Sequence, residues 1–187
     1  MARIIAGKAG SLSLDVPKSH TRPTSERVRE AIFSSLESRG ALEDARVLDL
    51  YAGSGALGLE ALSRGARTLL CVESQPSACA VVRKNAGKVQ AAIGSEGAVS
   101  VVAKTVSSFL SHNRQGFDLV FIDPPYSALN PQIVADLVAL SGCLEPGAIV
   151  VIERSSRDVE ITPPEGFTLL DSRNYGDTRV TTLERSR

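Results

Sequence analysis

The stretch from residue 118 to residue 126 combines an apolar run with groups that could do chemistry. The run at 119–122 is predicted to be a strand, and it ends in Asp123, Pro124, Pro125 and Tyr126. Proline fixes φ and has no N–H, so this turn is expected to be stiff and to present its carbonyl oxygens outward. Stiff acceptors beside an aromatic ring suit a planar substrate with an amino group, because the ring can stack and the oxygens can accept its N–H bonds. We predict these four residues to be catalytic; the alternative is an ordinary Pro-Pro turn with a surface tyrosine.

A glycine-rich segment lies upstream of this turn. It carries the pattern G-x-G-x-x-G at Gly53, Gly55 and Gly58, between a predicted strand and a predicted helix. Glycine lets the backbone turn sharply and lie against a ligand, because no Cβ stands in the way. Glu73, at the end of the next predicted strand, is placed to accept both hydroxyls of a ribose. These features fit a nicotinamide or flavin dinucleotide and a sulfonium cofactor equally well.

Asp49 distinguishes the two kinds of cofactor. It precedes Gly53 by four residues, where a pyrophosphate would meet a buried negative charge. A carboxylate there suits S-adenosylmethionine, which carries an ammonium and a sulfonium and no phosphate; the alternative is a cap for the amides of the glycine-rich segment. Thr105 and Val106 follow the third predicted strand, where an adenine ring would be received. The predicted cofactor contacts are Asp49, Tyr51, Ala52, Gly53, Ser54, Gly55, Gly58, Glu73, Ser74, Thr105 and Val106.

Short apolar strands that alternate with amphipathic helices must position these groups. The predicted strands are Arg46–Leu50, Thr68–Glu73, Val99–Ala103, Phe117–Ile122 and Ala148–Glu153. The predicted helices are Leu57–Arg64, Pro76–Val89, Val106–Asn113 and Pro131–Leu140. This alternation predicts an α/β fold with a parallel sheet covered on both faces. Two closing strands, Phe167–Arg173 and Arg179–Leu183, flank a hairpin turn at 174–177 and make the sheet mixed, with one antiparallel strand.

The first 40 residues are expected to form an extension of the same domain. Residues 3–7 and 11–16 predict a β-hairpin, and a helix capped by Thr24 or Ser25 is predicted to end at Gly40. Because cations are disfavoured at a helix N-terminus, the arginines of its first turns either pair with Glu26 and Glu30 or serve an anionic partner. The candidate contacts to such a partner are Arg3, Lys8, Arg22, Thr24, Arg27 and Arg29.

Composition limits the function classes. The chain has 187 residues, of which 43% are hydrophobic and 22% charged, which predicts one globular domain with an extension at 1–40 and a core at 41–187. Residues 1–30 carry a net charge of +3, residues 31–172 of −5 and residues 173–187 of +2, so basic ends flank an acidic middle. No stretch predicts a membrane span or a signal peptide, and three cysteines without a CxxC pair indicate free thiols in the cytoplasm. With only two histidines, no metal site is expected.

Taken together, these motifs resemble a known class of enzymes. The segment 49–58, Glu73 and the turn 123–126 are similar to S-adenosylmethionine-dependent methyltransferases that act on exocyclic amino groups. The opening 3–7, the segment 21–30 and the run 55–65 resemble the bacterial small-subunit rRNA guanine-N2 methyltransferases, the RsmD type. The resemblance extends from residue 3 to about residue 183.

The resemblance implies a seven-stranded Rossmann-like fold and methylation of the N2 of one guanine in 16S rRNA, with S-adenosylmethionine as cofactor. The acidic middle favours rRNA in an assembled or assembling small subunit over naked RNA, and a monomer is expected. Thr105 stands where many relatives of the wider class have an acidic or amide residue. The alternative interpretations are an adenine-N6 or cytosine-N4 DNA methyltransferase, a glutamine-amide methyltransferase (which resembles Asn-Pro-Pro-Tyr rather than Asp-Pro-Pro-Tyr), a nicotinamide oxidoreductase and a non-catalytic rRNA-binding assembly factor.

Overall fold

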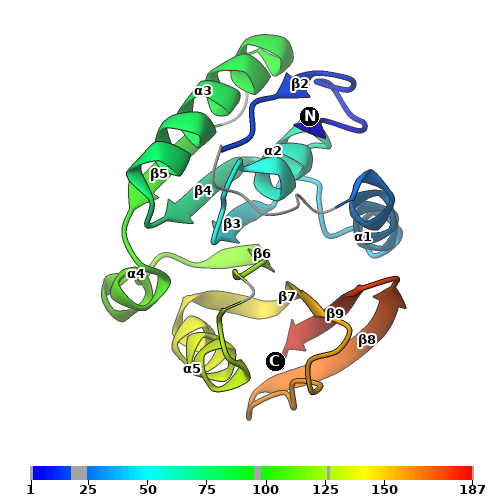
Figure 1. Cartoon of the computed structure of the whole chain (residues 1–187), viewed down its shortest axis with the longest axis vertical. Helices are drawn as coiled ribbons and strands as arrows, with labels where there is room; N and C mark the ends of the chain where they lie inside the picture. The colour runs from blue at the N-terminus through cyan, green and yellow to red at the C-terminus, as the bar shows by residue number, and fades with distance from the viewer. Residues whose placement is uncertain (1, 18–24, 95–97, 126, 187) are drawn as a thin grey trace.

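The computed structural model describes residues 2–17, 25–94, 98–125 and 127–186, and a seven-stranded sheet forms its centre (Figure 1). The strands lie in the order β5 (Ala98–Ala103), β4 (Thr68–Glu73), β3 (Arg46–Leu50), β6 (Phe117–Ile122), β7 (Leu144–Ser155), β9 (Thr178–Arg185) and β8 (Phe167–Tyr175). A separate antiparallel pair joins β1 (Ala2–Arg3) and β2 (Ser13–Leu14). Strands β5, β4, β3, β6 and β7 pair in parallel, while β9 is antiparallel to both β7 and β8. The predicted mostly parallel sheet with one antiparallel strand is confirmed.

Helices cover both faces of this sheet (Figure 1). One face packs against α1 (Glu26–Ser38), α2 (Ala56–Ser63) and α3 (Pro76–Ile93), and the other against α4 (Val106–His112) and α5 (Asn130–Leu140), which a 3-10 turn (Ser141–Cys143) follows. Side chains alternate between the faces along each strand because successive Cβ atoms point to opposite sides. Phe121 accordingly lies in the core under α1, and Val120 and Ile122 lie in the core under α4 and α5. Both cores need apolar residues, which explains why these strands read as continuous hydrophobic runs.

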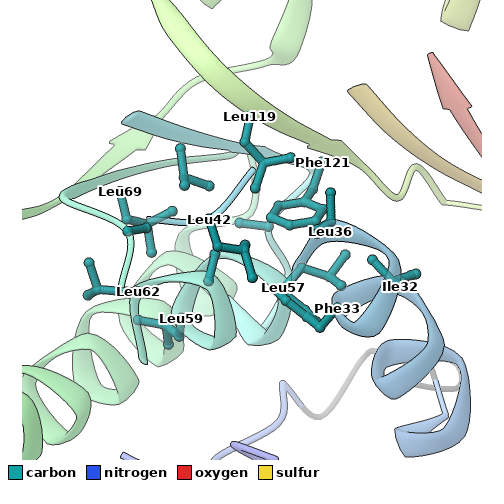
Figure 2. Packing of buried hydrophobic residues seen from close by; sticks show 14 of the residues in the cluster. Ile32, Phe33, Leu36, Leu42, Leu57, Leu59, Leu62, Leu69, Leu119 and Phe121 are labelled. Atoms are coloured by element: carbon teal, nitrogen blue, oxygen red, sulfur yellow. The ribbon is translucent and has the colours of Figure 1, made fainter. Parts of the chain in front are cut away.

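Helix α1 belongs to the core of the domain. Ser25 caps it by accepting the N–H of Val28, as the sequence predicts. Figure 2 shows Phe33 and Leu36 of α1 beside Phe121 of β6, and the rings of Phe33 and Phe121 are 5.7 Å apart between centroids. Truncation of a buried phenylalanine such as Phe33 to alanine typically costs about 3–5 kcal/mol. The extension is therefore held rigidly against the sheet.

The N-terminal hairpin is anchored to α2. The carboxylate of Glu60, which is fully buried, accepts the N–H of Ile5 at 2.6 Å and the N–H of Ala6 at 3.0 Å. The Ser63 hydroxyl donates to the carbonyl oxygen of Ala6 at 2.6 Å. Gly7 lies so close that a Cβ there would overlap the backbone of Ser63. The motif at 55–65 thus builds a docking site for the first residues of the chain.

Element bounds differ from the predictions mainly at the ends. Strand β7 begins at Leu144 rather than Ala148, because it continues through Pro146 and Gly147, next to a register shift between Phe117 and Leu119 of β6. The closing hairpin turns at 176–177, since β8 runs on to residue 175. Helix α3 continues four residues past its predicted end.

The three cysteines, Cys71, Cys79 and Cys143, are buried and free, as predicted. Within the described ranges, no helix has both the length and the apolar character that crossing a membrane requires.

Candidate functional site

Three neighbouring strands end side by side at one edge of the sheet. Leu50 of β3 pairs with Val72 of β4 and with Ile122 of β6, so the residues that follow these strands lie together. Those that follow Val72 and Ile122 are Glu73 and Asp123. In an open α/β sheet this carboxyl edge, where the strand order reverses, is where ligands bind. The two predicted carboxylates are therefore brought to one place.

The glycine-rich loop crosses this edge between β3 and α2. Gly53 has φ +58° and Gly55 has φ +77°, conformations that side chains with a Cβ rarely adopt. Gly58 is required for another reason, because a Cβ there would overlap Leu69 of β4. Helix α2 thus packs closely on the sheet and starts at the loop, directing its N-terminal amides toward the edge.

Glu73 is fixed by the backbone around it. One carboxylate oxygen accepts the N–H of Gly53 at 3.0 Å, and the other accepts the N–H of Gln75 at 2.8 Å. The residue is 8% exposed. Each oxygen keeps a second lone pair, so the carboxylate can still accept two hydroxyl donors.

Asp49 lies beneath the glycine-rich loop and is 2% exposed. Its Oδ2 accepts the N–H of Gly58 at 3.0 Å, so the alternative role as a cap for the loop's amides holds for this oxygen. Burial, with smaller effects from the charges of Asp123 and Glu73, raises the pKa of Asp49 to about 8. A cation placed nearby would offset these effects and favour the ionised carboxylate.

The side chain of Tyr51 is directed toward α5 rather than into the glycine-rich loop, so the predicted contact of Tyr51 to a cofactor stays a prediction that concerns its main chain. Its hydroxyl donates to the Oδ2 of Asp136 on α5 at 2.6 Å and accepts from the Nε2 of Gln132 at 3.2 Å. Tyr51 has φ +61°, a strained backbone conformation for a non-glycine residue. The hydrogen bonds of the Tyr51 hydroxyl to α5 therefore stabilise the turn of the main chain after β3.

The loop that carries the predicted catalytic residues is braced at its base. The carbonyl oxygen of Pro125 accepts the N–H of Ala128 at 2.9 Å, and the NH2 group of Arg154, on β7, donates to the carbonyl oxygen of Ala128 at 2.7 Å. Asp123 is half-buried and Pro124 is buried. Tyr126, the fourth predicted catalytic residue, lies outside the described residues. Sequence reasoning missed Arg154, since a single arginine at the end of a strand carries no local signal.

The remaining predicted cofactor contacts line the same edge. Thr105 caps α4, because its hydroxyl accepts the N–H of Ser108 at 3.3 Å, and Val106 is buried. Ser74 is exposed directly after β4. A contact between an adenine ring and residues 105–106 stays a prediction.

The predicted RNA-contact residues separate into two groups. Arg3, Lys8 and Arg27 are exposed, and Arg3 forms an ion pair of 2.9 Å with Glu26 at the start of α1. Arg29 is 1% exposed and its NH1 lies 3.9 Å from the buried Glu60. The prediction that Arg29 contacts RNA is therefore wrong for this structure, since α1 turns that side chain into the core. Arg22 and Thr24 lie outside the described residues.

A cavity of about 720 Å³ opens at the opposite, amino-terminal edge of the sheet. Its walls include Arg39, Arg46, Arg67, Asp118, Glu145 and Glu184. Arg46 is bonded there to Asp118 at 2.9 Å and to Glu145 at 3.0 Å, so two carboxylates share one guanidinium. This cavity is remote from the strand ends that carry the candidate site. Among the described residues, no group of three or more His, Cys, Asp or Glu side chains could hold a metal ion.

Comparison with known proteins gives consistent results over nearly the whole chain. A family model described as conserved hypothetical protein 95 matches residues 2–184. The chain is 33% identical over 177 residues to ribosomal RNA small subunit methyltransferase D of Haemophilus influenzae, a match that covers 93% of this chain and 89% of that protein. The Escherichia coli K12 protein of the same name is 34% identical over 168 residues, with coverages of 89% and 81%.

Solved structures agree with the fold. A hypothetical protein of Thermus thermophilus superposes with a TM-score of 0.81 at 34% identity, covering 97% of this chain and 98% of its own. The magnesium protoporphyrin IX methyltransferase of Synechocystis, solved with S-adenosylmethionine bound, reaches a TM-score of 0.66 at 13% identity, with coverages of 86% and 79%. At that identity the likeness concerns the fold alone.

Proposed function

Because this chain belongs to the RsmD-like family of bacterial small-subunit rRNA methyltransferases, we propose that it methylates the exocyclic N2 of a guanine in 16S rRNA. The observation that carries the proposal is the convergence of Asp49, Glu73 and Asp123 at the ends of three adjacent strands. The first two carboxylates face the glycine-rich loop, and the third begins the stiff turn. One edge of the sheet thus offers a site for a cation beside acceptors for an amine.

S-adenosylmethionine is the cofactor, and the residues at the glycine-rich loop fit it. Asp49 is a buried carboxyl group that would ionise to pair with the ammonium, whereas its ionised form would repel a pyrophosphate. Glu73, held by two backbone N–H groups, would accept the hydroxyls of the ribose. Ser74, Thr105 and Val106 would surround the adenine. When bound, this cofactor supplies an electrophilic methyl group on a sulfonium centre.

The acceptor side must overcome the weak nucleophilicity of the guanine amine. The lone pair of N2 is delocalised into the ring, so the nitrogen has to be turned toward sp³ geometry. We assign this task to the carboxylate of Asp123 and the carbonyl oxygen of Pro124, which accept the two N–H bonds, with Tyr126 stacking on the base. The nitrogen becomes strongly acidic only after it gains the methyl group, so no tuned general base is needed and Asp123 can pass the proton to water.

Rigidity of the turn supports this assignment. Two prolines fix φ at consecutive positions, and Arg154 holds the carbonyl oxygen of Ala128 at 2.7 Å. Because the turn is already rigid, its acceptor oxygens can hold the amine without a further loss of conformational entropy when the substrate binds. Alignment of two reacting groups can contribute roughly 7–11 kcal/mol to lowering a barrier. Asp123 and its neighbours would thus act mainly by orientation.

The extension supports an RNA substrate. Arg3, Lys8 and Arg27 are exposed cations near the hairpin and the start of α1, where they would contact the phosphates that flank the target. Arg22 and Thr24 stay candidates for the same role. The target base must leave its stack, which costs a few kcal/mol and favours a loop nucleotide. The acidic middle of the chain favours rRNA presented in a small subunit or an assembly intermediate.

One assay tests the proposal. Small subunits that lack the modification are incubated with the protein and labelled methyl donor, and the rRNA is digested to nucleosides. We expect N2-methylguanosine at one position, and none with Asp123→Ala. Label in N6-methyladenosine or N4-methylcytidine would favour the rival base methyltransferase, and no label in any nucleoside would favour the non-catalytic assembly factor.

A further inference from the structure

The residue that joins the cofactor loop to the N-terminal extension is Asn85, on α3. Its side chain is 0% exposed and is bonded entirely to main-chain groups of two distant segments. The amide oxygen accepts the N–H of Asp15 at 2.9 Å, and the amide nitrogen donates to the carbonyl oxygen of Asp15 at 2.9 Å. The same nitrogen donates to the carbonyl oxygen of Ser54 at 2.9 Å. Both amide hydrogens and one lone pair are therefore used.

On one side, these bonds fix the centre of the glycine-rich loop. Ser54 lies between the two glycines with positive φ. Its carbonyl oxygen is held by Asn85, while the N–H of Gly55 donates to the carbonyl oxygen of Ala52 at 2.7 Å. Both ends of the Ser54–Gly55 peptide are bonded, so this peptide cannot rotate alone. A ligand that shifts the loop must also shift Asn85.

On the other side, the bonds fix the chain where it leaves the hairpin. Asp15 follows β2 directly, and its carboxylate is held from the same helix by Lys84 at 2.9 Å and Lys88 at 3.0 Å. Residues 16 and 17 follow and complete this described range. The position of the chain where it leaves the hairpin is thus set by α3.

We propose that Asn85 is a positioning residue that couples the cofactor loop to the rRNA-contacting extension. The inference rests on the proposed function, because it takes the loop as the S-adenosylmethionine site and the extension as the rRNA site. Asparagine suits this task because one small side chain offers an acceptor and two donors. Aspartate would keep the acceptor but lose both donors and place a charge against two carbonyl oxygens. Coupling of this kind between two sites typically amounts to about 5- to 150-fold.

Amide hydrogen exchange tests the coupling without any turnover. The probe is S-adenosylhomocysteine, added at a concentration that saturates the protein by calorimetry. In the wild-type chain we expect it to slow exchange at the Asp15 amide by about fivefold or more. Asn85→Asp should lose this response. Val89→Ala is the matched control, because Val89 is equally buried one turn further along α3 and its apolar side chain can form no hydrogen bond to either segment.

The exchange and binding data together distinguish failure of the coupling from failure of the cofactor assignment. Saturable binding with unchanged exchange at Asp15 in the wild-type chain would overturn the proposal, even if Asn85→Asp fails to fold. The same response in Asn85→Asp as in the wild type would also overturn it. Absence of any binding would instead contradict the cofactor assignment.

Steady-state kinetics of the two variants provides a second test of the coupling. With small subunits as substrate, Asn85→Asp should lower kcat by about tenfold at saturating concentrations of both substrates, whereas Val89→Ala should lower the melting temperature and keep kcat. Equal loss of kcat in both variants would reduce Asn85 to a structural role. If no subunit is methylated while the exchange response is present, the proposed reaction fails and the coupling of the two segments stands.

Discussion

Replacement of Asp49 by asparagine should make the free protein more stable at alkaline pH and weaken its binding of the cofactor. Asparagine has nearly the same shape, and its carbonyl oxygen can still accept the N–H of Gly58. What it lacks is the ionisable carboxyl. Asp49→Asn therefore separates the charge of this residue from its role as a cap.

The size of the effect follows from the pKa. Burial raises the pKa of Asp49 from its ordinary 3.8 to about 8. Each pKa unit corresponds to about 1.4 kcal/mol, so ionisation of this group in the folded free protein costs on the order of 6 kcal/mol more than in the unfolded chain. The folded state holds the proton more tightly than the unfolded state. The contribution of Asp49 to the free energy of unfolding is thus fully present below about pH 4 and is lost as the pH rises to about 8.

Asp49→Asn removes this pH dependence. Urea unfolding at pH 5, 7 and 9 should show a smaller decline in stability for the variant than for the wild type, with the variant more stable at pH 9. Asp136→Asn is a useful control, because burial also raises the pKa of Asp136 and that residue bonds Tyr51 rather than the glycine-rich loop.

Whereas Asp49→Asn should raise the stability of the free protein at alkaline pH, it should lower the affinity for the cofactor. At pH 7 the free protein holds the Asp49 proton, and pairing with an ammonium should release it. Calorimetry in two buffers of different ionisation enthalpy should therefore detect proton release with the wild type that is absent in Asp49→Asn, whose Kd should rise about 10- to 100-fold. Asp136→Asn should retain both the affinity and the proton release. Equal proton release and equal affinity in Asp49→Asn and wild type would refute the assignment of Asp49 to a cation.

Single variants at four further residues test the remaining assignments. Asp123→Ala should lower kcat by at least about 100-fold while the Kd for S-adenosylmethionine stays within about twofold, and a variant with wild-type turnover would remove Asp123 from catalysis. Arg27→Ala should raise the KM for rRNA and reduce the slope of log affinity against log salt by about 0.7–0.9. Arg29→Met should leave that slope alone and cost about 1–3 kcal/mol of unfolding free energy, because the buried Glu60 loses the charge of Arg29 at 3.9 Å but keeps its ion pair with Arg64 at 2.7 Å; a salt effect in Arg29→Met would return this arginine to the RNA surface. Tyr51→Phe should cost about 1–3 kcal/mol of unfolding free energy by leaving the buried Asp136 without its donor, as thermal unfolding would show, and an unchanged unfolding free energy would contradict this role of the hydroxyl.

Sequence patterns predicted the central strands to the residue. Arg46–Leu50, Thr68–Glu73 and Phe117–Ile122 are short apolar runs that are covered on both faces, and each is bounded by polar or turn-forming residues. Because parallel strands deliver their last residues to one edge, the meeting of Glu73 and Asp123 followed from the strand order. The glycine pattern likewise predicted where the backbone must turn.

What the sequence could not predict depends on tertiary packing. Arg29 falls on the same face of α1 as Val28 and Phe33, but a charged side chain gives no sign that it enters the core. Its partner, Glu60, is 31 positions away and lies within an apolar helix. Tyr51 was assigned to the cofactor loop by position alone, whereas its hydroxyl reaches Asp136 across 85 residues. Asn85 is not part of any sequence motif, because its role depends on hydrogen bonds to Asp15 and Ser54, which only the fold brings next to it.

A crystal structure of the wild-type chain with S-adenosylhomocysteine bound would show whether the glycine-rich loop and the turn at Asp123 form one site. We expect the ammonium of the ligand beside Asp49, the ribose hydroxyls on Glu73 and the sulfur facing Asp123. A ligand seated elsewhere, such as in the cavity at the opposite edge of the sheet, or a sulfur turned away from Asp123, would contradict this expectation.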